Sequence, residues 1–304
     1  MAPYLPDPFR GTVERRVLRK DETTLSLELR AAQSALAARA MTIGDIDLII
    51  VSSFMPDYLG VGNAAYLARE LGATCPAWNL ESACSGSVVA FHTACGLVQA
   101  GHYRNVLVGV SCVYSRIGDE QDTFSWFLGD GCGAFIVGPV EPGHGLLGLK
   151  TITTVATCGA LSVRVNPDPG ADQKMLMVAM PHAGKVWRHT VPESLRMCSK
   201  EACRAAGVDI SDIDFFILNT ANAWFAEAAA NFLEVDPSRI VSLYPQVANI
   251  GSAIVPVNLH AAALARKVKP GDLILMYSVA SVATASAVVA RWGDVALGPR
   301  AVGI

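Results

Sequence analysis

The sequence predicts an α/β protein built from two related halves, each with a buried sheet that helices cover. Runs of Val, Ile and Leu alternate with longer amphipathic segments, a pattern typical of strands buried on both faces and of helices between them. The order of these elements is the same in both halves. Similar segments also recur about 166 residues apart, for example from 45 to 212 and from 84 to 249. A repeat of that length indicates a duplicated domain rather than a solenoid.

Three pairs of similar segments carry the duplication. They are residues 45–51 and 212–218, residues 83–87 and 248–252, and residues 105–108 and 272–275. The segment 140–148 holds three Gly and one Pro, so it is the expected joint between the halves. We therefore expect a first domain at residues 1–143 and a second at residues 144–304.

Each half is expected to contain a helix, a strand, a second helix, an extended segment, a turn, an apolar helix and two further strands. In the first half these are residues 25–40, 48–53, 64–71, a turn at Cys84, 87–100, 105–112 and 133–137. In the second half they are residues 191–206, 215–218, 223–233, a turn at Asn249, 254–268, 273–278 and 287–291. The two apolar helices carry few charges, so each should be buried on all sides. Two stacked sheets with a central layer of helices fit this pattern.

The composition excludes several classes of protein. Apolar residues make up 52% and charged residues 17%, so the chain can bury a large core and is not disordered. The 24 basic and 27 acidic residues give a net charge of −3, which leaves no basic excess for nucleic acid or an anionic membrane. No apolar run reaches the roughly 20 residues that span a bilayer, and the N-terminus has no apolar signal core. We therefore expect a cytoplasmic protein.

One of the eight cysteines is distinguished by its position. No CxxC or HxxxH pair is present, so we expect no metal site, and most of the thiols should be small buried residues in a reducing compartment. Cys84 instead ends an extended segment and begins an apolar helix, between the small residues Ala83 and Ser85. The N–H groups at a helix N-terminus favour a thiolate, which is the nucleophilic form. The pattern indicates a nucleophile on a strand–helix turn, and it also fits a buried thiol beside a tight turn.

Three motifs resemble those of the thiolase-fold condensing enzymes, and most of all β-ketoacyl-ACP synthase III. Residues 83–86 (Ala-Cys-Ser-Gly) resemble that family's nucleophile turn, residues 128–134 (Leu-Gly-Asp-Gly-Cys-Gly-Ala) its Gly-Asp-Gly-Ala-Gly loop, and residues 248–252 (Ala-Asn-Ile-Gly-Ser) its Asn-containing turn. The resemblance covers the chain from about Val17 onward. It implies a thiolase-like five-layer α-β-α-β-α fold, a nucleophilic Cys84 and a hydrogen-bonding Asn249.

The chain departs from the family pattern where the family has a catalytic His. The family's Pro-His-Gln-Ala-Asn segment aligns with residues 218–222, which puts Asn219 in the place of the His and retains the last Asn as Asn222. A family Arg near the pantetheine tunnel is replaced by Trp224. The family's last strand offers an oxyanion N–H, and here the N–H of Ala280 is expected to serve, because a backbone donor does not depend on the side chain.

The loss of the His favours acyl transfer over carbon–carbon bond formation. Decarboxylative condensation needs donors that stabilise an enolate, and removing one such donor typically slows a reaction by about 10²–10³-fold. The amide of Asn219 donates hydrogen bonds but is neither an acid nor a base near neutral pH. Two alternatives stay open: a condensing enzyme that tolerates Asn219 as an oxyanion donor, and a catalytically silent subunit of a heterodimeric ketosynthase. Cys84 argues against the silent subunit, which would have no need of a nucleophile.

The resemblance also implies the substrates and partners. The acyl group would come from an acyl carrier protein or coenzyme A thioester, in polyketide, fatty acid or other secondary metabolism, with no bound cofactor. A homodimer is expected, with the strand at 106–112 in its interface.

His182, on a loop before a helix, is the histidine best placed to reach a pocket, whereas His92 is expected in the core.

Aromatic and apolar segments are candidates for the acyl pocket. Residues 59–61, 117–127 and 175–179 supply the Phe, Trp and Met side chains that suit an apolar acyl chain or ring. Trp126 and Phe127 are candidate lining residues, together with Asn222 and Trp224 from the resemblance. Trp126 and Phe127 fit a subunit interface equally well. The acyl group itself is beyond what the sequence specifies.

Overall fold

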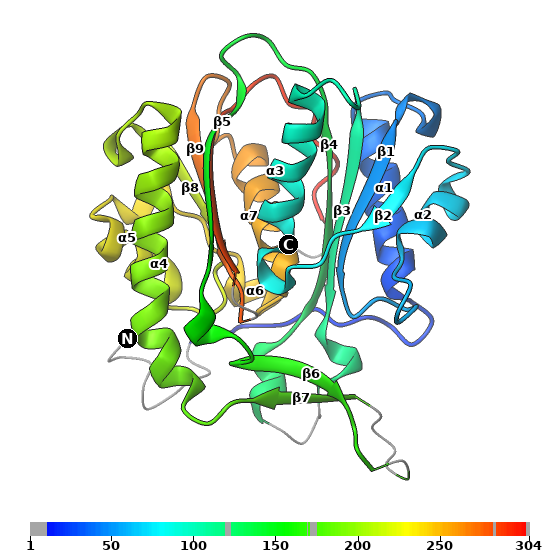
Figure 1. Ribbon diagram of the computed structural model, residues 1–304, viewed down its shortest axis with the longest axis vertical. Coiled ribbons are helices and arrows are strands. Elements are labelled where there is room, and N and C mark those ends of the chain that lie inside the picture. Colours follow the sequence, from blue (N-terminus) through cyan, green and yellow to red (C-terminus); the bar gives the residue numbers. More distant parts are fainter. Residues whose placement is uncertain (1–10, 119–122, 169, 171–174, 282–283, 302–304) are drawn as a thin grey trace.

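Two four-stranded sheets stand face to face, with helices between them and on both outer sides (Figure 1). The computed structural model describes residues 11–118, 123–168, 170, 175–281 and 284–301. The strand order is β2-β1-β3-β4 in the first sheet and β5-β10-β9-β8 in the second. The first sheet consists of β1 (Leu48–Phe54), β2 (Ala77–Asn79), β3 (Val106–Val113) and β4 (Asp130–Val137). The second consists of β5 (Gly145–Thr153), β8 (Phe215–Leu218), β9 (Leu273–Val279) and β10 (Thr284–Arg291).

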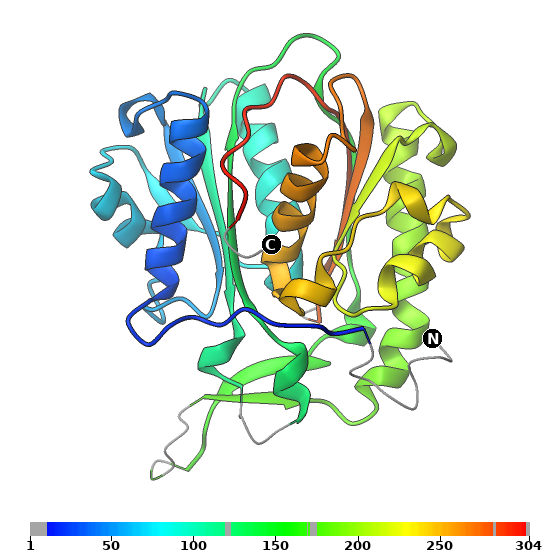
Figure 2. The same ribbon diagram turned by 180° about the vertical axis from the view of Figure 1, so that it is seen from behind.

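Helices form three layers around the two sheets (Figures 1 and 2). The outer face of the first sheet is covered by α1 (Thr24–Ala38) and α2 (Ala64–Leu71), and that of the second by α4 (Ala183–Ala206) and α5 (Phe225–Leu233). The helices α3 (Gly86–Gln99) and α7 (Ile254–Leu264) lie side by side between the sheets. Neither of them carries a charged residue, so both can be buried against two sheets at once. The predicted five-layer α-β-α-β-α fold is confirmed.

The duplication is visible in the strand topology. β1 pairs in parallel with β3, and β3 pairs antiparallel with β4. In the second half β8 pairs in parallel with β9, and β9 pairs antiparallel with β10. In the first half, β1 also pairs with β2 on its other side. In the second half, the corresponding pairing of β8 is a single parallel bridge between Phe216 and Ile240.

The repeated Asp-Ile-Asp motif explains how each half begins its sheet. Asp45 and Asp212 each close a capping box around the 3-10 turn before the first strand of their half. Asp47 and Asp214 then accept backbone N–H groups at the start of the neighbouring parallel strand, at 2.9 and 2.8 Å. The motif therefore fixes the register of the two central strands in both halves.

The structure adds elements that the sequence did not predict. The helix expected at 191–206 instead begins at Ala183, as α4. Its start was misplaced because Pro usually marks the first turn of a helix, whereas Pro192 lies inside α4. The segment 145–153, expected partly as a joint, forms β5 and pairs antiparallel with β10. A hairpin of β6 (Leu161–Val165) and β7 (Met175–Ala179) projects below the two sheets in Figure 1. The four-residue helix α6 (Tyr244–Val247) precedes the turn of Asn249.

The strand expected at a dimer interface lies inside the sheet. Every residue of β3 is buried, and the strand is hydrogen-bonded on both sides, to β1 and to β4. The placement of residues 106–112 at an interface is therefore wrong. The edge of this sheet is formed by β2, where Trp78 is 37% exposed. None of the described helices has the length and apolar character to cross a membrane.

Candidate active site

The candidate residues gather where the parallel strands of the two sheets end. Cys84 follows β2, Tyr114 follows β3, and Asn219 follows β8. Carboxyl ends of parallel strands share one edge of a sheet and are the usual place for a ligand site in open α/β sheets. The two halves pack so that the turn before α3 contacts the turn before α7. One site at the junction of the two sheets follows from this arrangement.

The turn that carries Cys84 is tightly constrained. It is a 3-10 turn, Ala83–Ser85, which leads directly into α3. Ala83 has a φ of 45°, a left-handed conformation that non-glycine residues seldom adopt and that clusters at functional sites. A Cβ on Gly86 would lie 2.0 Å from Oγ of Ser52, so only Gly fits there. The hydroxyl of Ser278, from the second half, donates to the carbonyl of Cys84. The half-buried Cys84 is therefore held at the N-terminus of α3.

The equivalent turn of the second half presents Asn249. Its backbone N–H donates to the carbonyl of Phe127 at 2.8 Å, and its carbonyl accepts from the N–H of Gly129 at 2.9 Å. Its side-chain Oδ1 accepts the N–H of Gly251 at 2.9 Å. The carbonyl oxygen of the amide is thus used within the turn, and its NH₂ group is left to donate to a substrate oxygen.

Asn219 is 2% exposed and is held from two sides. Its Nδ2 donates to the carbonyl of Gly251 at 3.0 Å, and its backbone N–H donates to Tyr277. Asn258 of α7, fully buried, anchors the adjoining segment by donating to the carbonyl of Leu218 and the hydroxyl of Thr220, both at 3.1 Å. The end of β8 is therefore fixed relative to α7.

Gly251 is the point at which these residues meet. Its φ is 54°, and a Cβ built on it would lie 2.5 Å from Sγ of Cys112 and 3.2 Å from Oη of Tyr114. Oη of Tyr114 lies 3.7 Å from Sγ of Cys84. The carbonyl of Gly251 binds Asn219 and its N–H binds Asn249. Around Gly251 the structure thus brings together the three residues that the sequence singled out.

The sequence did not single out Tyr114 or Cys112, which lie at the end of β3. Both are buried, so in the sequence they resemble the core residues of any strand of this kind. The available signal was position, since Tyr114 is the first residue after a strand of the parallel pair.

Burial dominates the electrostatics of Cys84. It raises the pKa of the thiol, and the nearby carboxylate of Glu81 raises it further, whereas a hydrogen bond from Tyr114 lowers it. The thiol of Cys112 and the hydroxyl of Tyr114 also have pKa values well above their ordinary ranges, because both groups are buried. The bias towards thiolate that we expected from the helix N-terminus is outweighed. In the resting protein Cys84 holds its proton near neutral pH.

Ala280 is not available in the way that the sequence suggested. Its N–H donates to the carbonyl of Thr284 at 2.7 Å, within the connection between β9 and β10. The backbone N–H of Cys84 itself helps to stabilise the negative sulfur and so lowers the pKa of this thiol. This N–H is a better candidate for the oxyanion donor.

The four predicted pocket residues lie in different surroundings. Trp126 is 57% exposed and lies under the guanidinium of Arg15, at 5.5 Å from its ring centre, so it is a surface residue. Phe127 is half-buried, and its carbonyl is bound by the turn of Asn249. Oδ1 of Asn222 is buried without a hydrogen-bond partner, as expected of an atom that a substrate would satisfy. Trp224 caps α5 and lines a small pocket with Glu227, Ala228, Asn231 and Phe232.

None of the six histidines, all within the described part of the chain, has a recorded hydrogen bond to Cys84, Asn219 or Asn249. His92 lies on α3, and its Nε2 is 3.3 Å from the hydroxyl of Thr151. His182 is exposed at the start of α4. Among the described residues, therefore, no imidazole is hydrogen-bonded to the candidate residues in place of the missing one.

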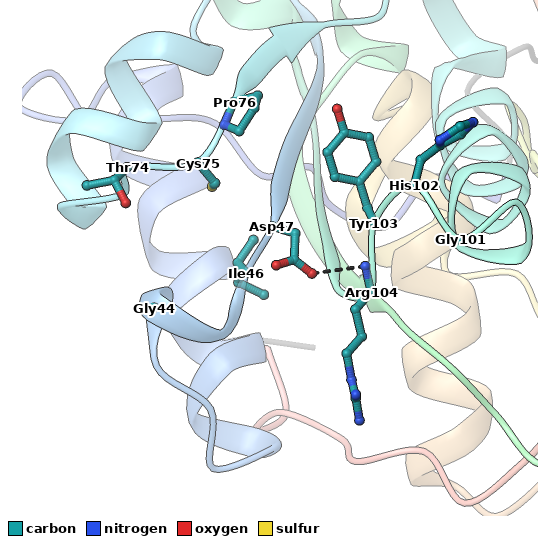
Figure 3. Close-up of a pocket in the computed structure, with 10 residues that line it drawn as sticks. All are labelled: Gly44, Ile46, Asp47, Thr74, Cys75, Pro76, Gly101, His102, Tyr103 and Arg104. Carbon is teal, nitrogen blue, oxygen red and sulfur yellow. Dashed lines mark hydrogen bonds between the residues drawn. The ribbon is translucent and has the colours of Figure 1, made fainter.

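A separate surface pocket lies at the opposite ends of the parallel strands (Figure 3). It is lined by the residues that precede β1, β2 and β3, and its polar centre is Asp47. That carboxylate already accepts the N–H groups of Arg104 and Asn105, both at 2.9 Å. These bonds hold the sheet together, so we assign this pocket no catalytic role.

Comparison with known proteins agrees with this fold. The fold and the paired turns define a thiolase-like acyltransferase. The family model described as 3-oxoacyl-[acyl-carrier-protein (ACP)] synthase III matches residues 78–154, and that described as its C-terminal part matches residues 203–292. The chain is 31% identical to the β-ketoacyl-[acyl-carrier-protein] synthase III of Porphyra purpurea, over 93% of this chain and 89% of the relative. The chain belongs to the β-ketoacyl-[acyl-carrier-protein] synthase III family.

Solved structures show the same similarity. The synthase III of Thermus thermophilus superposes with a TM-score of 0.83 at 27% identity, over 93% of this chain and 88% of that one. The priming β-ketosynthase of the R1128 polyketide biosynthetic pathway gives a TM-score of 0.83 at 25% identity, over 92% and 85% of the two chains. Membership of this family makes the chain an acyltransferase of the synthase III type.

Proposed function

We propose that this acyltransferase moves an acyl group through a thioester on Cys84, from an acyl carrier protein or coenzyme A thioester to a second acceptor. The observation that carries the proposal is the pair of amides. The buried Asn219 and the half-buried Asn249 are both hydrogen-bonded to Gly251, close to a half-buried thiol, and no histidine in the described part of the chain is hydrogen-bonded to these residues. Amides can donate hydrogen bonds to an oxyanion but cannot move a proton near neutral pH.

The first half-reaction requires only groups that the site contains. Sγ of Cys84 attacks the carbonyl carbon of the donor thioester, and the oxygen gains negative charge. The NH₂ of Asn249 and the N–H of Cys84 stabilise that oxyanion. The bond to the leaving sulfur breaks, and the leaving thiolate takes the proton that Cys84 held. The products are an acyl thioester on Cys84 and the free carrier thiol, with no bound cofactor involved.

The second half-reaction transfers the acyl group to the acceptor. An acceptor with an O–H, N–H or S–H group attacks the Cys84 thioester through the same oxyanion site, and its proton returns to the sulfur of Cys84. Asn222, whose buried Oδ1 lacks a partner, is suited to accept a hydrogen bond from an amide N–H of the pantetheine arm. Decarboxylative condensation remains the second candidate function, because the named relatives are synthases of the β-ketoacyl type.

Mass spectrometry of the intact protein tests the thioester directly. After incubation with acyl coenzyme A or acyl carrier protein, we expect one acyl mass on the wild type and none on Cys84→Ala. Cys95→Ala is the matched control, since Cys95 is a buried thiol on α3, the helix that follows Cys84, and this variant should be acylated normally. Failure of every thioester to label Cys84 would overturn the proposal and favour a silent subunit.

A second variant separates acyl transfer from condensation. If the missing His limits enolate stabilisation, Asn219→His should raise the decarboxylation of a malonyl thioester by about 10²-fold. Asn231→His, at an exposed position of α5, is the control. Carbon dioxide release by the wild type at the rate of Asn219→His would favour condensation instead.

We also propose a homodimer that forms through the edge strand β2. β2 is hydrogen-bonded to β1 on one side only, and Trp78 on it is 37% exposed. Leu59 and Val61 are exposed beside it, and Asn79 of β2 donates to the carbonyl of Val61 at 2.8 Å. An apolar edge of this kind favours pairing with a second copy. Light scattering should give twice the chain mass, and Trp78→Glu should give a monomer. The cytoplasmic location stays a prediction.

A further inference from the structure

Cys112 and Tyr114 place two more reactive groups beside the candidate nucleophile. Cys112 is in β3 and Tyr114 is the first residue after it, and both side chains reach Gly251, where an added Cβ would lie 2.5 Å from Sγ of Cys112 and 3.2 Å from Oη of Tyr114. Both are fully or almost fully buried. The ring of Tyr114 packs against Phe54 with centroids 5.3 Å apart, which fixes its hydroxyl 3.7 Å from Sγ of Cys84. Gly251 leaves the room that both side chains need, since a Cβ there would collide with Sγ of Cys112 and crowd Oη of Tyr114.

The hydroxyl of Tyr114 has one hydrogen to donate and can accept from other groups. Burial raises the pKa of Cys112 well above its ordinary value, so that thiol stays protonated and its S–H needs an acceptor. Tyr114 interacts with both thiols. If the S–H of Cys112 occupies a lone pair of Oη, the hydrogen of the hydroxyl is directed to Sγ of Cys84. The three groups then form a directed chain from Cys112 through Tyr114 to Cys84.

The other groups around Cys84 make this donor important. Glu81, on the segment before the turn, is acidic and disfavours a thiolate. Asp130 of β4 raises the pKa of Cys112 and so likewise disfavours its thiolate. Within the described part of the chain, no cationic side chain is among the groups that shift the pKa of either thiol. From the second half the site receives the neutral Asn249 and Ser278. Tyr114 is thus the side chain that opposes burial by donating to Sγ, together with the N–H groups at the start of α3.

We propose that Tyr114 is a catalytic residue that donates a hydrogen bond to Sγ of Cys84, and that Cys112 is the positioning residue that orients its hydroxyl. Tyr114 stabilises the thiolate of Cys84, whose negative charge passes to the carbonyl oxygen as the sulfur attacks a thioester. It supplies a donor at the sulfur, whereas Asn249 supplies one at the carbonyl oxygen. This inference rests on the proposed function only in taking Cys84 as the nucleophile.

Alkylation of Cys84 by iodoacetamide across pH 6–10, followed by peptide mass spectrometry, tests this hydrogen-bond chain without any acyl substrate. A hydrogen bond to a charged group is worth about 1.5–3 kcal/mol and a neutral one about 1 kcal/mol. For this long contact we expect Tyr114→Phe to slow alkylation at pH 7 by roughly 5-fold and to move the profile of Cys84 to higher pH. Tyr277→Phe is the matched control, because the hydroxyl of Tyr277 is also buried but bonds to Ser194 on the side of α4. It should leave the profile unchanged.

The variants of Cys112 keep the test decisive if Tyr114→Phe folds poorly, which its thermal unfolding would show. Cys112→Ser retains a donor to Tyr114 and should alkylate like the wild type. Cys112→Ala removes the donor and should slow alkylation of Cys84 in the same direction as Tyr114→Phe, by a smaller factor. An unchanged profile in both Tyr114→Phe and Cys112→Ala would overturn the inference. A shift to lower pH in Tyr114→Phe would also overturn it, because the thiol of Cys84 would then be the donor.

The outcome is independent of the acyl-transfer experiment. A shifted alkylation profile without any acyl adduct would support the hydrogen-bond chain from Cys112 to Cys84 and contradict the proposed function. An acyl adduct on Cys84 with an unshifted profile would do the reverse.

Discussion

The turn of Cys84 and the turn of Asn249 share a backbone but differ in chemistry. Each contains an Ala with a positive φ, 45° at Ala83 and 59° at Ala248. Each also contains a 3-10 turn, Ala83–Ser85 in the first and Gly251–Ala253 in the second, that leads into an uncharged helix between the sheets. One turn carries a thiol and the other an amide. The comparison teaches that the duplicated fold supplies two equivalent positions facing each other, and that the site needs a different group at each.

The largest expected effect comes from removing the amide at the second turn. Asn249→Ala deletes the NH₂ that we assign to the oxyanion, and loss of one such donor typically slows acyl transfer by about 10²–10³-fold. The rate of Cys84 acylation measures it by mass spectrometry. Asn231→Ala, on the surface pocket beside α5, is the control and should keep the wild-type rate. A rate within about 2-fold of the wild type for Asn249→Ala would mean that the two turns do not act on one carbonyl.

The close contact between the halves can be broken at Gly251. Gly251→Ala adds a methyl group that meets Cys112 and Tyr114 at a left-handed φ, so we expect a loss of about 2–4 kcal/mol in the free energy of unfolding. Urea denaturation measures the loss. Gly96→Ala is the matched control, because no atom lies within 4 Å of the added methyl in the middle of α3. That variant should be neutral or slightly more stable.

The two halves also differ in the polar pair between the outer helix and the sheet. In the second half Ser194 of α4 meets Tyr277, whereas in the first half the fully buried Glu28 of α1 accepts from Ser111 at 2.6 Å and from Asn63 at 2.8 Å. Burial raises the pKa of Glu28 above its ordinary value of 4.5. Between pH 4.5 and the raised pKa, the folded protein therefore holds a proton on Glu28 that the unfolded chain has lost.

The stability that Glu28 contributes is thus complete below about pH 4.5 and falls as pH rises through its raised pKa. Glu28→Gln keeps a neutral side chain that can donate and accept, so it should flatten this decline and be more stable than the wild type at pH 8, relative to pH 5. Urea midpoints at both pH values measure the difference. Glu70→Gln, on the surface, should follow the wild type. A parallel decline in Glu28→Gln would remove Glu28 as the source.

The smallest expected effect concerns the shared backbone. Ala83→Gly and Ala248→Gly each relieve a positive φ that costs a non-glycine residue about 1–3 kcal/mol, offset by about 0.4–1 kcal/mol of added freedom in the unfolded chain. We expect a gain of about 0.5 kcal/mol in each and the same sign in both. Thermal unfolding measures it. Opposite signs in the two variants would show that the turns are strained to different degrees.

Much of the fold could be predicted from the sequence because local patterns were unambiguous. The buried strand at 215–218 and the helix at 64–71 were predicted at the bounds that the structure shows. The start of α4 was missed, because Pro192 has the local signal of a helix start and only packing against the second sheet carries the helix back to Ala183. β5 was missed because its pairing with β10 joins segments more than 130 residues apart.

The site was predicted in part for the same reason. Cys84 and Asn249 could be found because each stands in a repeated motif, and Asn219 because it aligns with a family segment. Ala280 could not be evaluated, since whether its N–H is used depends on the carbonyl of Thr284 across the turn. Trp126 could not be assigned between pocket and surface, since its exposure depends on Arg15 in a distant segment.

The sequence by itself determined the two halves, their order of elements and the placement of a thiol and an amide on equivalent turns. These follow from local hydrophobic periodicity and from the repeat, which need no knowledge of distant contacts. Only the tertiary structure decided that Gly251 joins Asn219, Asn249 and Tyr114 around Cys84, and that this thiol holds its proton. Hydrogen bonds across the halves and the loss of solvent depend on distances in space, which no pattern along the chain records.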